Sequence, residues 1–177
     1  MPPSNALTIA SNGGLLNVLG CPIRVTTPIA AAGEVPERTT SDVMAVWDTG
    51  ATGSVITQAI VGKLGIAPIG LTQVHGVNST DLSEVYLVDF HFPMGVVIRG
   101  LNVTLGALVG IDALVGMDVI TAGDFSITNK NGRTKMSFRV PSQIEVDYVE
   151  ESNRQGMSRA ERRHPGKAQP RPPRPKR

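Results

Sequence analysis

The stretch AVWDTGATGSVIT, residues 45–57, constrains the fold of this chain more than any other, because one acidic residue, Asp48, ends its apolar run. A lone carboxylate among apolar residues costs free energy unless donors hydrogen-bond to it. Gly50 allows the backbone to turn sharply and to bring an N–H close to the carboxylate. The stretch therefore predicts a strand that ends in a tight loop around either a satisfied structural acid or a working one.

The remainder of the sequence between residues 20 and 150 predicts mostly strands, with one or two short helices. Short apolar runs recur with turn residues between them, and the pair Asn131-Gly132 between FSITN and KMSFRV is a strong hairpin signal. QAIVGKLG predicts a short helix that Gly65 ends. The fold class expected is therefore all-β.

The segment EVYLVDFHF, residues 84–92, alternates along its length. This pattern predicts a strand with Val85, Leu87, Asp89 and His91 on one face. Tyr86, Val88, Phe90 and Phe92 are then expected on the other face.

Length and charge predict three regions. A chain of 177 residues suggests a single folded domain. We expect a loose segment over residues 1–19, the domain over 20–150 and a basic, proline-rich tail over 151–177. Residues 1–150 hold 8 Lys/Arg against 13 Asp/Glu, whereas residues 151–177 hold 9 against 2. The positive charge therefore belongs to the tail and does not indicate a nucleic-acid-binding domain.

The tail predicts disorder, because it has few apolar residues, five prolines and many like charges. A basic anchor for RNA, for an anionic surface or for a partner protein is the alternative interpretation. No aromatic residue lies between the charges, so base stacking has no support there.

Several classes of protein are disfavoured by composition. The single Cys21 excludes an internal disulfide framework, and the three histidines show no metal-ligand spacing. No apolar run reaches the roughly 18 residues that span a membrane, and the N-terminus lacks the basic start of a signal peptide. We therefore expect a soluble, cytoplasmic protein that uses no metal and no cofactor.

The chemistry open to Asp48 depends on a second carboxylate. Two carboxylates held within hydrogen-bonding distance share one proton, since both cannot ionise. Such a pair can deprotonate a water with one member and protonate a carbonyl oxygen with the other. The chain has no internal repeat and one Asp-Thr-Gly, so the second carboxylate would have to come from a second chain.

At these residues the sequence resembles the retroviral-type, or retropepsin-like, aspartic proteases, which are single-lobed and work as homodimers. The first matching element is Asp48-Thr49-Gly50-Ala51-Thr52, followed by Ser54-Val55-Ile56. The second is Gln73–Asn78, a strand, a glycine and a strand at the place of the family's flap. The third is Ala113–Asp118, ALVGMD, like the apolar-apolar-glycine element that packs beneath the catalytic loop, and LVGMDVITAGDFSIT looks especially like bacterial members.

The resemblance implies an aspartic endopeptidase that hydrolyses extended peptides as a homodimer. It implies that Asp48 activates the water, that Thr49 bonds across the dimer and that Gly50 supports the carboxylate. It also implies substrate contacts at a further set of residues. These are Ala51, Gly76, Val77 and Val115.

Two departures and two rival functions stay open. The chain has Trp47 where an aliphatic residue is commoner in the family, and Gly53 where glycine is usually avoided. A catalytically silent module of the same fold, for dimerisation or peptide binding, is the alternative function. Asp48-x-Gly50-x-Thr52 also fits the first phosphate loop of actin-like ATPases and sugar kinases, but those folds need well over twice this length and a second acidic phosphate loop.

Overall fold

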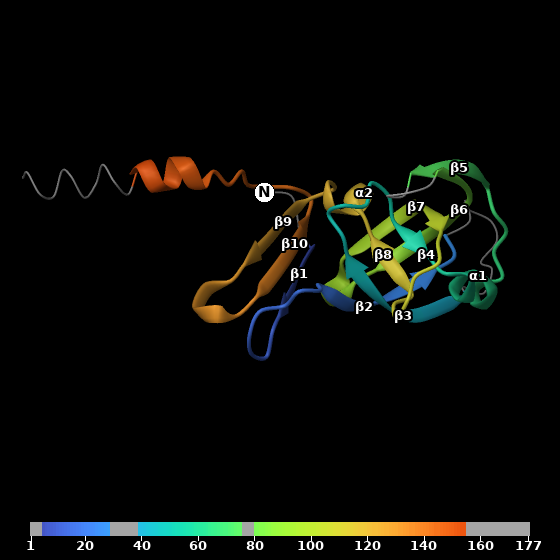
Figure 1. Cartoon of the computed structure of the whole chain (residues 1–177), viewed down its shortest axis with the longest axis horizontal. Coiled ribbons are helices and arrows are strands. Elements are labelled where there is room, and N and C mark those ends of the chain that lie inside the picture. The colour runs from blue at the N-terminus through green and yellow to red at the C-terminus, as the bar shows by residue number, and fades with distance from the viewer. Residues whose placement is uncertain (1–4, 29–38, 76–79, 155–177) are drawn as a thin grey trace, which may run out of the picture. The chain divides into compact units, whose positions relative to one another are not determined.

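The computed structural model describes residues 5–28, 39–75 and 80–154 (Figure 1). By contacts, the chain divides into two units, residues 1–143 and 144–177, and each is described by itself. The strands are β1 (Asn5–Ala10), β2 (Gly20–Thr26), β3 (Thr40–Trp47), β4 (Val55–Ile56), β5 (Gly70–His75), β6 (Thr80–His91), β7 (Val97–Leu105), β8 (Ala113–Val115), β9 (Asp124–Thr128) and β10 (Lys135–Val140). The helical elements of the first unit are α1 (Gln58–Leu64), η1 (Pro93–Gly95), α2 (Met117–Ile120) and η2 (Lys130–Gly132).

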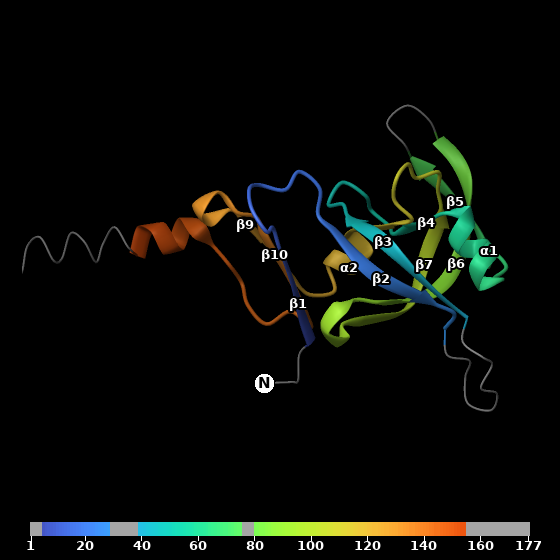
Figure 2. The same cartoon turned by 90° about the horizontal axis from the view of Figure 1, so that it is seen from below.

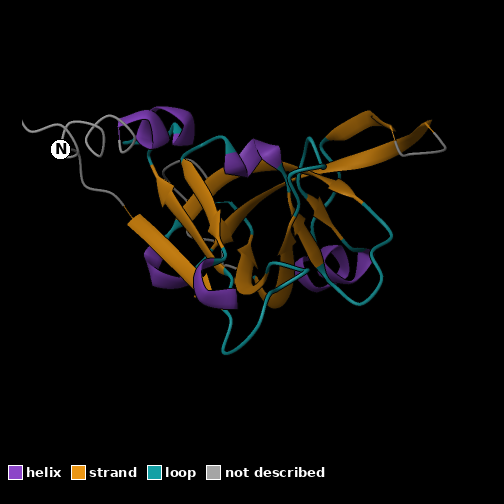
Figure 3. Ribbon diagram, turned by 60° about the vertical axis from the view of Figure 1, so that its left-hand side comes forward, coloured by secondary structure: helices purple, strands orange, loops and turns teal. Residues whose placement is uncertain are grey.

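Six strands of the first unit close into a barrel. They lie in the order β2-β3-β8-β4-β7-β6, and an additional pairing of β2 with β6 completes the ring. β5 extends the sheet beyond β6, while β1, β10 and β9 form a separate three-stranded sheet (Figures 1 and 2). Figure 3 shows how few helical turns accompany these strands. The expected all-β architecture is therefore confirmed.

The short strand β8 lies between the two strands that enter and leave the Asp48 loop. Val46 of β3 pairs with Leu114 in parallel, and Val55 of β4 pairs with the same residue in antiparallel. The loop is therefore attached on both sides to a segment about 60 residues further along the chain.

The predicted helix and hairpin are both present. α1 buries Ile60, Val61 and Leu64, and it ends at Gly65, whose φ of 63° is in the left-handed region. The Gly65 N–H donates to the Val61 carbonyl at 2.9 Å, which satisfies one of the last carbonyls of the helix. At the hairpin, Asn131 and Gly132 have φ of 57° and 69°, the conformation that this pair favours.

The first nineteen residues contain a strand, contrary to the expected loose segment. β1 pairs antiparallel with β10, with Leu7 opposite Phe138, and both side chains are buried. The alternation of apolar and polar residues in NALTIA is too short to predict a strand by itself. The strand β10 that pairs with it lies about 130 residues away in sequence.

The alternation expected along β6 is present, and one residue of the second face, Asp89, is buried as well. Tyr86, Val88 and Phe90 on one face are buried, and Asp89 on the other face is only 1% exposed. The pairing of β6 with β7 shifts register between Val88 and Phe90, where Asp89 lies opposite two residues of β7, Arg99 and Gly100. Asp89 Oδ1 there accepts a hydrogen bond of 2.8 Å from the Gly100 N–H.

Trp47 joins the barrel to the three-stranded sheet. Its ring centroid lies 5.1 Å from that of Phe92, 5.6 Å from Phe125 of β9 and 5.0 Å from Phe138 of β10. Its Nε1 donates to Cys21 Sγ at 3.3 Å, so the polar atom of the buried indole has a partner. Burial raises the pKa of the Cys21 thiol. The tryptophan thus fills an aromatic cluster where an aliphatic residue would leave space.

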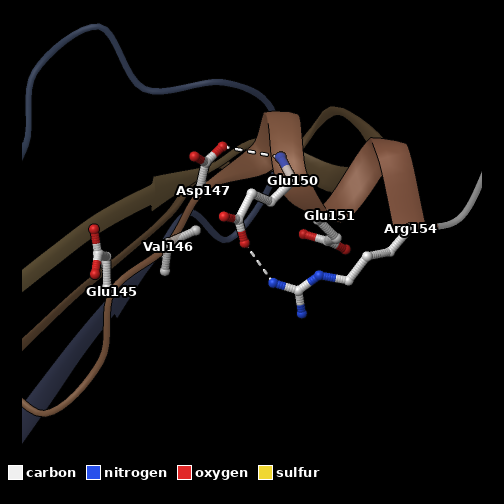
Figure 4. Close-up of a pocket in the computed structure, with 6 residues that line it drawn as sticks. All are labelled: Glu145, Val146, Asp147, Glu150, Glu151 and Arg154. Carbon is white, nitrogen blue, oxygen red and sulfur yellow. Dashed lines mark hydrogen bonds and ion pairs between the residues drawn. The ribbon is translucent and has the colours of Figure 1, made fainter.

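The described part of the second unit, residues 144–154, ends in a helix over 148–154. Asp147 Oδ1 accepts hydrogen bonds from the N–H groups of Val149 (2.8 Å) and Glu150 (3.0 Å), as an N-cap does. Arg154 pairs with Glu150 one turn away (Figure 4). The hollow drawn there is lined by four carboxylates, one cation and Val146, and by no predicted site residue.

Among the described residues, no helix has both the length and the apolar character that a membrane span requires.

Asp124 ties the start of β9 to the end of β10, and this predicts a pH-dependent stability. Hydrogen bonds from Ser142, Arg139 and the Gln143 N–H hold the pKa of Asp124 well below its usual value. A folded-state pKa below the unfolded value of about 3.9 adds stability above that value, and the stability is lost as the pH falls through the folded-state pKa.

Asp124→Asn is therefore expected to lower the urea midpoint at pH 7, and its deficit should shrink as the pH falls below about 4. Urea unfolding of both proteins at several pH values measures the difference. A deficit that stays constant from pH 7 down to about pH 3 would contradict the assigned interaction.

Candidate active site

Asp48 lies at the point where β3 leaves the barrel wall. Residues alternate along β3, so Trp47 faces the core, and the next residue begins the loop. The Asp48 N–H donates to the Val115 carbonyl at 2.9 Å, which continues the β3–β8 pairing by one residue. The half-buried carboxylate accepts a hydrogen bond through Oδ1 from the Gly50 N–H at 2.8 Å. The expected support of the carboxylate by Gly50 is therefore present in the geometry.

The turn that follows β8 holds the Asp48 loop in place through two backbone hydrogen bonds. The Ala51 carbonyl accepts the Met117 N–H at 2.8 Å, and the Thr52 carbonyl accepts the Asp118 N–H at 3.2 Å. These bonds leave the loop little freedom to shift against the barrel.

Gly116 allows this close approach. A Cβ added at Gly116 would lie 2.6 Å from both the carbonyl carbon and the oxygen of Gly53, and 3.0 Å from the Ala51 oxygen. The φ of Gly116 is −91°, a value that any residue adopts. Glycine is therefore required here by the space between two backbones and not by its conformational freedom. Gly53, which stands where the resembled family usually avoids glycine, supplies the backbone atoms nearest to Gly116.

The side chain of Asp118 also holds the Asp48 loop, through hydrogen bonds to Ser54. Its Oδ2 accepts the Ser54 N–H at 2.9 Å, and its Oδ1 accepts the Ser54 hydroxyl at 2.8 Å and the Val119 N–H at 2.9 Å. The Ser54 oxygen in turn accepts the Gly116 N–H at 3.1 Å. Ser54 is fully buried, so its polar groups depend on these partners.

The sequence alone does not indicate this link between Asp118 and the Asp48 loop. The stretch LVGMDVI resembles the Asp48 stretch, because a carboxylate stands in an apolar run and needs hydrogen-bond donors. That signal indicates that donors must be found. It does not indicate that they lie 64 residues earlier in the chain.

The other predicted catalytic residue, Thr49, is exposed beside Asp48. Within the described ranges its hydroxyl has no hydrogen-bond partner, and the Asp48 carboxylate accepts only the bond from Gly50. Both side chains are therefore available at the surface of a single chain. Over the same ranges no group of three or more His, Cys, Asp and Glu side chains is placed to hold a metal.

The four predicted substrate-binding residues fall into three situations. Ala51 is half-buried in the loop. Val115 is fully buried, and its described contact with the loop is made by its carbonyl oxygen. Gly76 and Val77 lie outside the described residues, between β5 and β6, which form the antiparallel pair expected around them.

Gly116→Ala is expected to destabilise the domain by about 1–3 kcal/mol, because the added methyl group meets backbone atoms that cannot rotate away. Gly62→Ala is the matched control: it lies inside α1 with no atom within 4 Å of its added Cβ. That change should stabilise the protein by about 0.5–1 kcal/mol. Urea unfolding measures both, and equal effects of the two changes would refute the role of Gly116.

The pair Ser54 and Asp118 can be tested by a double-mutant cycle. Asp118→Ala removes three accepted hydrogen bonds and is expected to cost about 2–4 kcal/mol, with a smaller cost for Ser54→Ala. Because the two residues share bonds, the double variant should lose about 1–2 kcal/mol less than the sum. Costs that simply add in urea unfolding would show that the bonds contribute no coupling.

Comparison with known proteins supports the fold. No family model matches the sequence, and no curated protein matches it. The structure is similar to the crystal structure of a retropepsin-like aspartic protease from Rickettsia conorii, with a TM-score of 0.50 and 12% identity over 78% of this chain and 96% of that one. A foamy viral protease-reverse transcriptase in complex with an RNA/DNA hybrid matches with a TM-score of 0.39 and 18% identity, over 78% of this chain and 14% of that one. The similarity to the Rickettsia conorii protein and the closed barrel together show that the chain has an all-β, retropepsin-like fold.

Proposed function

We propose that this chain is an aspartic endopeptidase that works as a homodimer, with one Asp48 from each subunit. The observation that carries the proposal is the fastening of the Asp48 loop. The carboxylate is held by the Gly50 N–H at 2.8 Å, while hydrogen bonds and the absence of a Gly116 side chain fix the loop from below. Such rigid support suits an acid that must meet a partner with hydrogen-bond accuracy.

The dimer follows from the single acid. One carboxylate cannot both accept a proton from water and donate one to the substrate. In the described residues Asp118 is committed to Ser54 and Val119. A second copy of this chain would supply the missing Asp48, and the exposed Thr49 hydroxyl would then bond to the partner's loop.

In the proposed reaction, the two Asp48 carboxyl groups share one proton and hold a water between them. The ionised carboxylate takes a proton from the water, whose oxygen bonds to the scissile carbonyl carbon. The protonated carboxyl group gives its proton to the carbonyl oxygen. Proton transfer to the amide nitrogen and cleavage of the C–N bond release the two peptides. The rate should be highest at acidic to mildly acidic pH, where the pair holds one proton.

The peptide would lie in an extended form over the loop. Backbone groups around Gly76 and Val77 would add main-chain hydrogen bonds to it, as an added strand does. Ala51 would border the peptide, and Val115 would contribute from beneath the loop. We infer a preference for apolar residues beside the cleaved bond.

Asp48→Asn tests the function directly. The variant should lose peptide cleavage by at least about 100-fold, because it removes both acid and base chemistry, while the solution mass stays that of a dimer. Asp42→Asn is the matched control on the same strand, since Asp42 is exposed and paired only with Arg24 and such pairs contribute little. Cleavage of a peptide library with sedimentation of the same samples measures both quantities.

The outcomes separate the candidate functions. A monomer that cleaves at the full rate would refute the dimer. Equal cleavage by wild type and Asp48→Asn would show that the activity belongs to a contaminant. A dimer that binds peptides but cleaves none from acid to neutral pH would identify the silent peptide-binding module.

A further inference from the structure

A cationic hollow lies at one end of the three-stranded sheet, where β1 ends, β10 begins and the β9–β10 turn closes. The register places Ala10 and Thr128 on either side of Lys135. The hollow has a volume of about 440 Å³, and Lys130, Arg133 and Lys135 line it. Figure 1 shows the turn after β9 and the loop after β1 at this same end of the sheet.

The charge of this hollow is not balanced by the protein. No carboxylate lines it, and within the described ranges none of its three cations forms an ion pair. Elsewhere in this unit Arg24 pairs with Asp42, and Arg139 pairs with Asp124. Three like charges around one hollow repel each other, so an anion placed among them would be stabilised.

The floor of the hollow is held in place by buried polar contacts. Arg133 Nη2 donates to the Ser11 carbonyl at 3.1 Å, and the Ser11 N–H donates to the Thr134 carbonyl at 2.9 Å. The Thr134 hydroxyl accepts the Leu16 N–H at 2.9 Å and donates to Asn129 Oδ1 at 2.7 Å. Ser11 and Thr134 are only 5% and 2% exposed. A site whose floor is already ordered loses less entropy when a ligand binds.

We propose that this hollow binds the diphosphate group of a small phosphorylated ligand. Two linked phosphates carry about three negative charges at neutral pH, which matches the three cations. The hydroxyl of Thr128 and the amide of Asn131 also line the hollow and can donate to phosphate oxygens. A single phosphate carries at most about two negative charges and would leave one cation unpaired. This site is independent of Asp48 and of the proposed peptidase activity.

Pyrophosphate added to the full-length protein tests the proposal by residue-resolved NMR. The tail over residues 155–177 holds eight Lys/Arg, so a whole-chain signal would mix two kinds of binding. Saturable shifts are expected at the amides of Thr128, Gly132 and Lys135, weakening as salt is added. Citrate, a tricarboxylate, serves as the comparison anion and should shift these amides at least about tenfold more weakly.

Two double variants with equal loss of charge provide the control. Lys130→Gln with Lys135→Gln should raise the Kd for pyrophosphate at least about tenfold, because two charge-assisted contacts are lost. Arg133 is kept, since it also holds the Ser11 carbonyl. Lys63→Gln with Arg99→Gln removes two exposed cations from α1 and β7 and should leave the Kd unchanged.

Four results would overturn the proposal. The first is that pyrophosphate shifts no amide at all, and the second is that it shifts only amides of the tail over residues 155–177. Both double variants could weaken binding equally, which would show attraction by net charge alone. Citrate could bind as tightly as pyrophosphate, which would exclude a phosphate-specific site. Peptide cleavage by Lys130→Gln with Lys135→Gln is measured in parallel, so that failure of this site is distinguished from failure of the peptidase.

Discussion

The close approach of one backbone to another beneath the Asp48 loop is the constraint on which the site depends. Gly116 lies so near Gly53 and Ala51 that no side chain fits between them. Asp118 adds hydrogen bonds from the same turn to Ser54. The position of the carboxylate is thus set by a segment far along the chain and not by the loop alone, which is how a short flexible sequence can hold an acid rigidly.

The aromatic cluster around Trp47 extends this support to the rest of the unit. The residue just before Asp48 packs on Phe125 and Phe138, which belong to the three-stranded sheet. The start of the loop is therefore fixed by core packing on one side and by β8 on the other. The tryptophan is a departure from the resembled family, but here it has both a partner for its N–H and neighbours for its ring.

Local chemistry explains how much of this was predictable. The Asp48 loop, the end of α1 at Gly65 and the hairpin at Asn131-Gly132 all follow from residues within a few positions of each other. β1 and the link from Asp118 to Ser54 depend on partners far away in sequence, and the burial of Asp89 depends on the pairing of β6 with β7. Periodicity carries no information about such partners, since register and long-range pairing arise only when the whole barrel closes. The substrate contacts expected of Gly76 and Val77 at the flap remain a prediction.

The pairing of β1 with β10 has a consequence for synthesis. Asn5 lies opposite Val140, so β1 has its partner only when about 130 further residues have left the ribosome. The loop at Asp48 likewise waits for residues 115–118 before its backbone is held. A nascent chain therefore carries an acidic loop without its scaffold until translation of the unit is nearly complete. Assembly is consequently a late, collective event, as is usual for folds dominated by distant contacts.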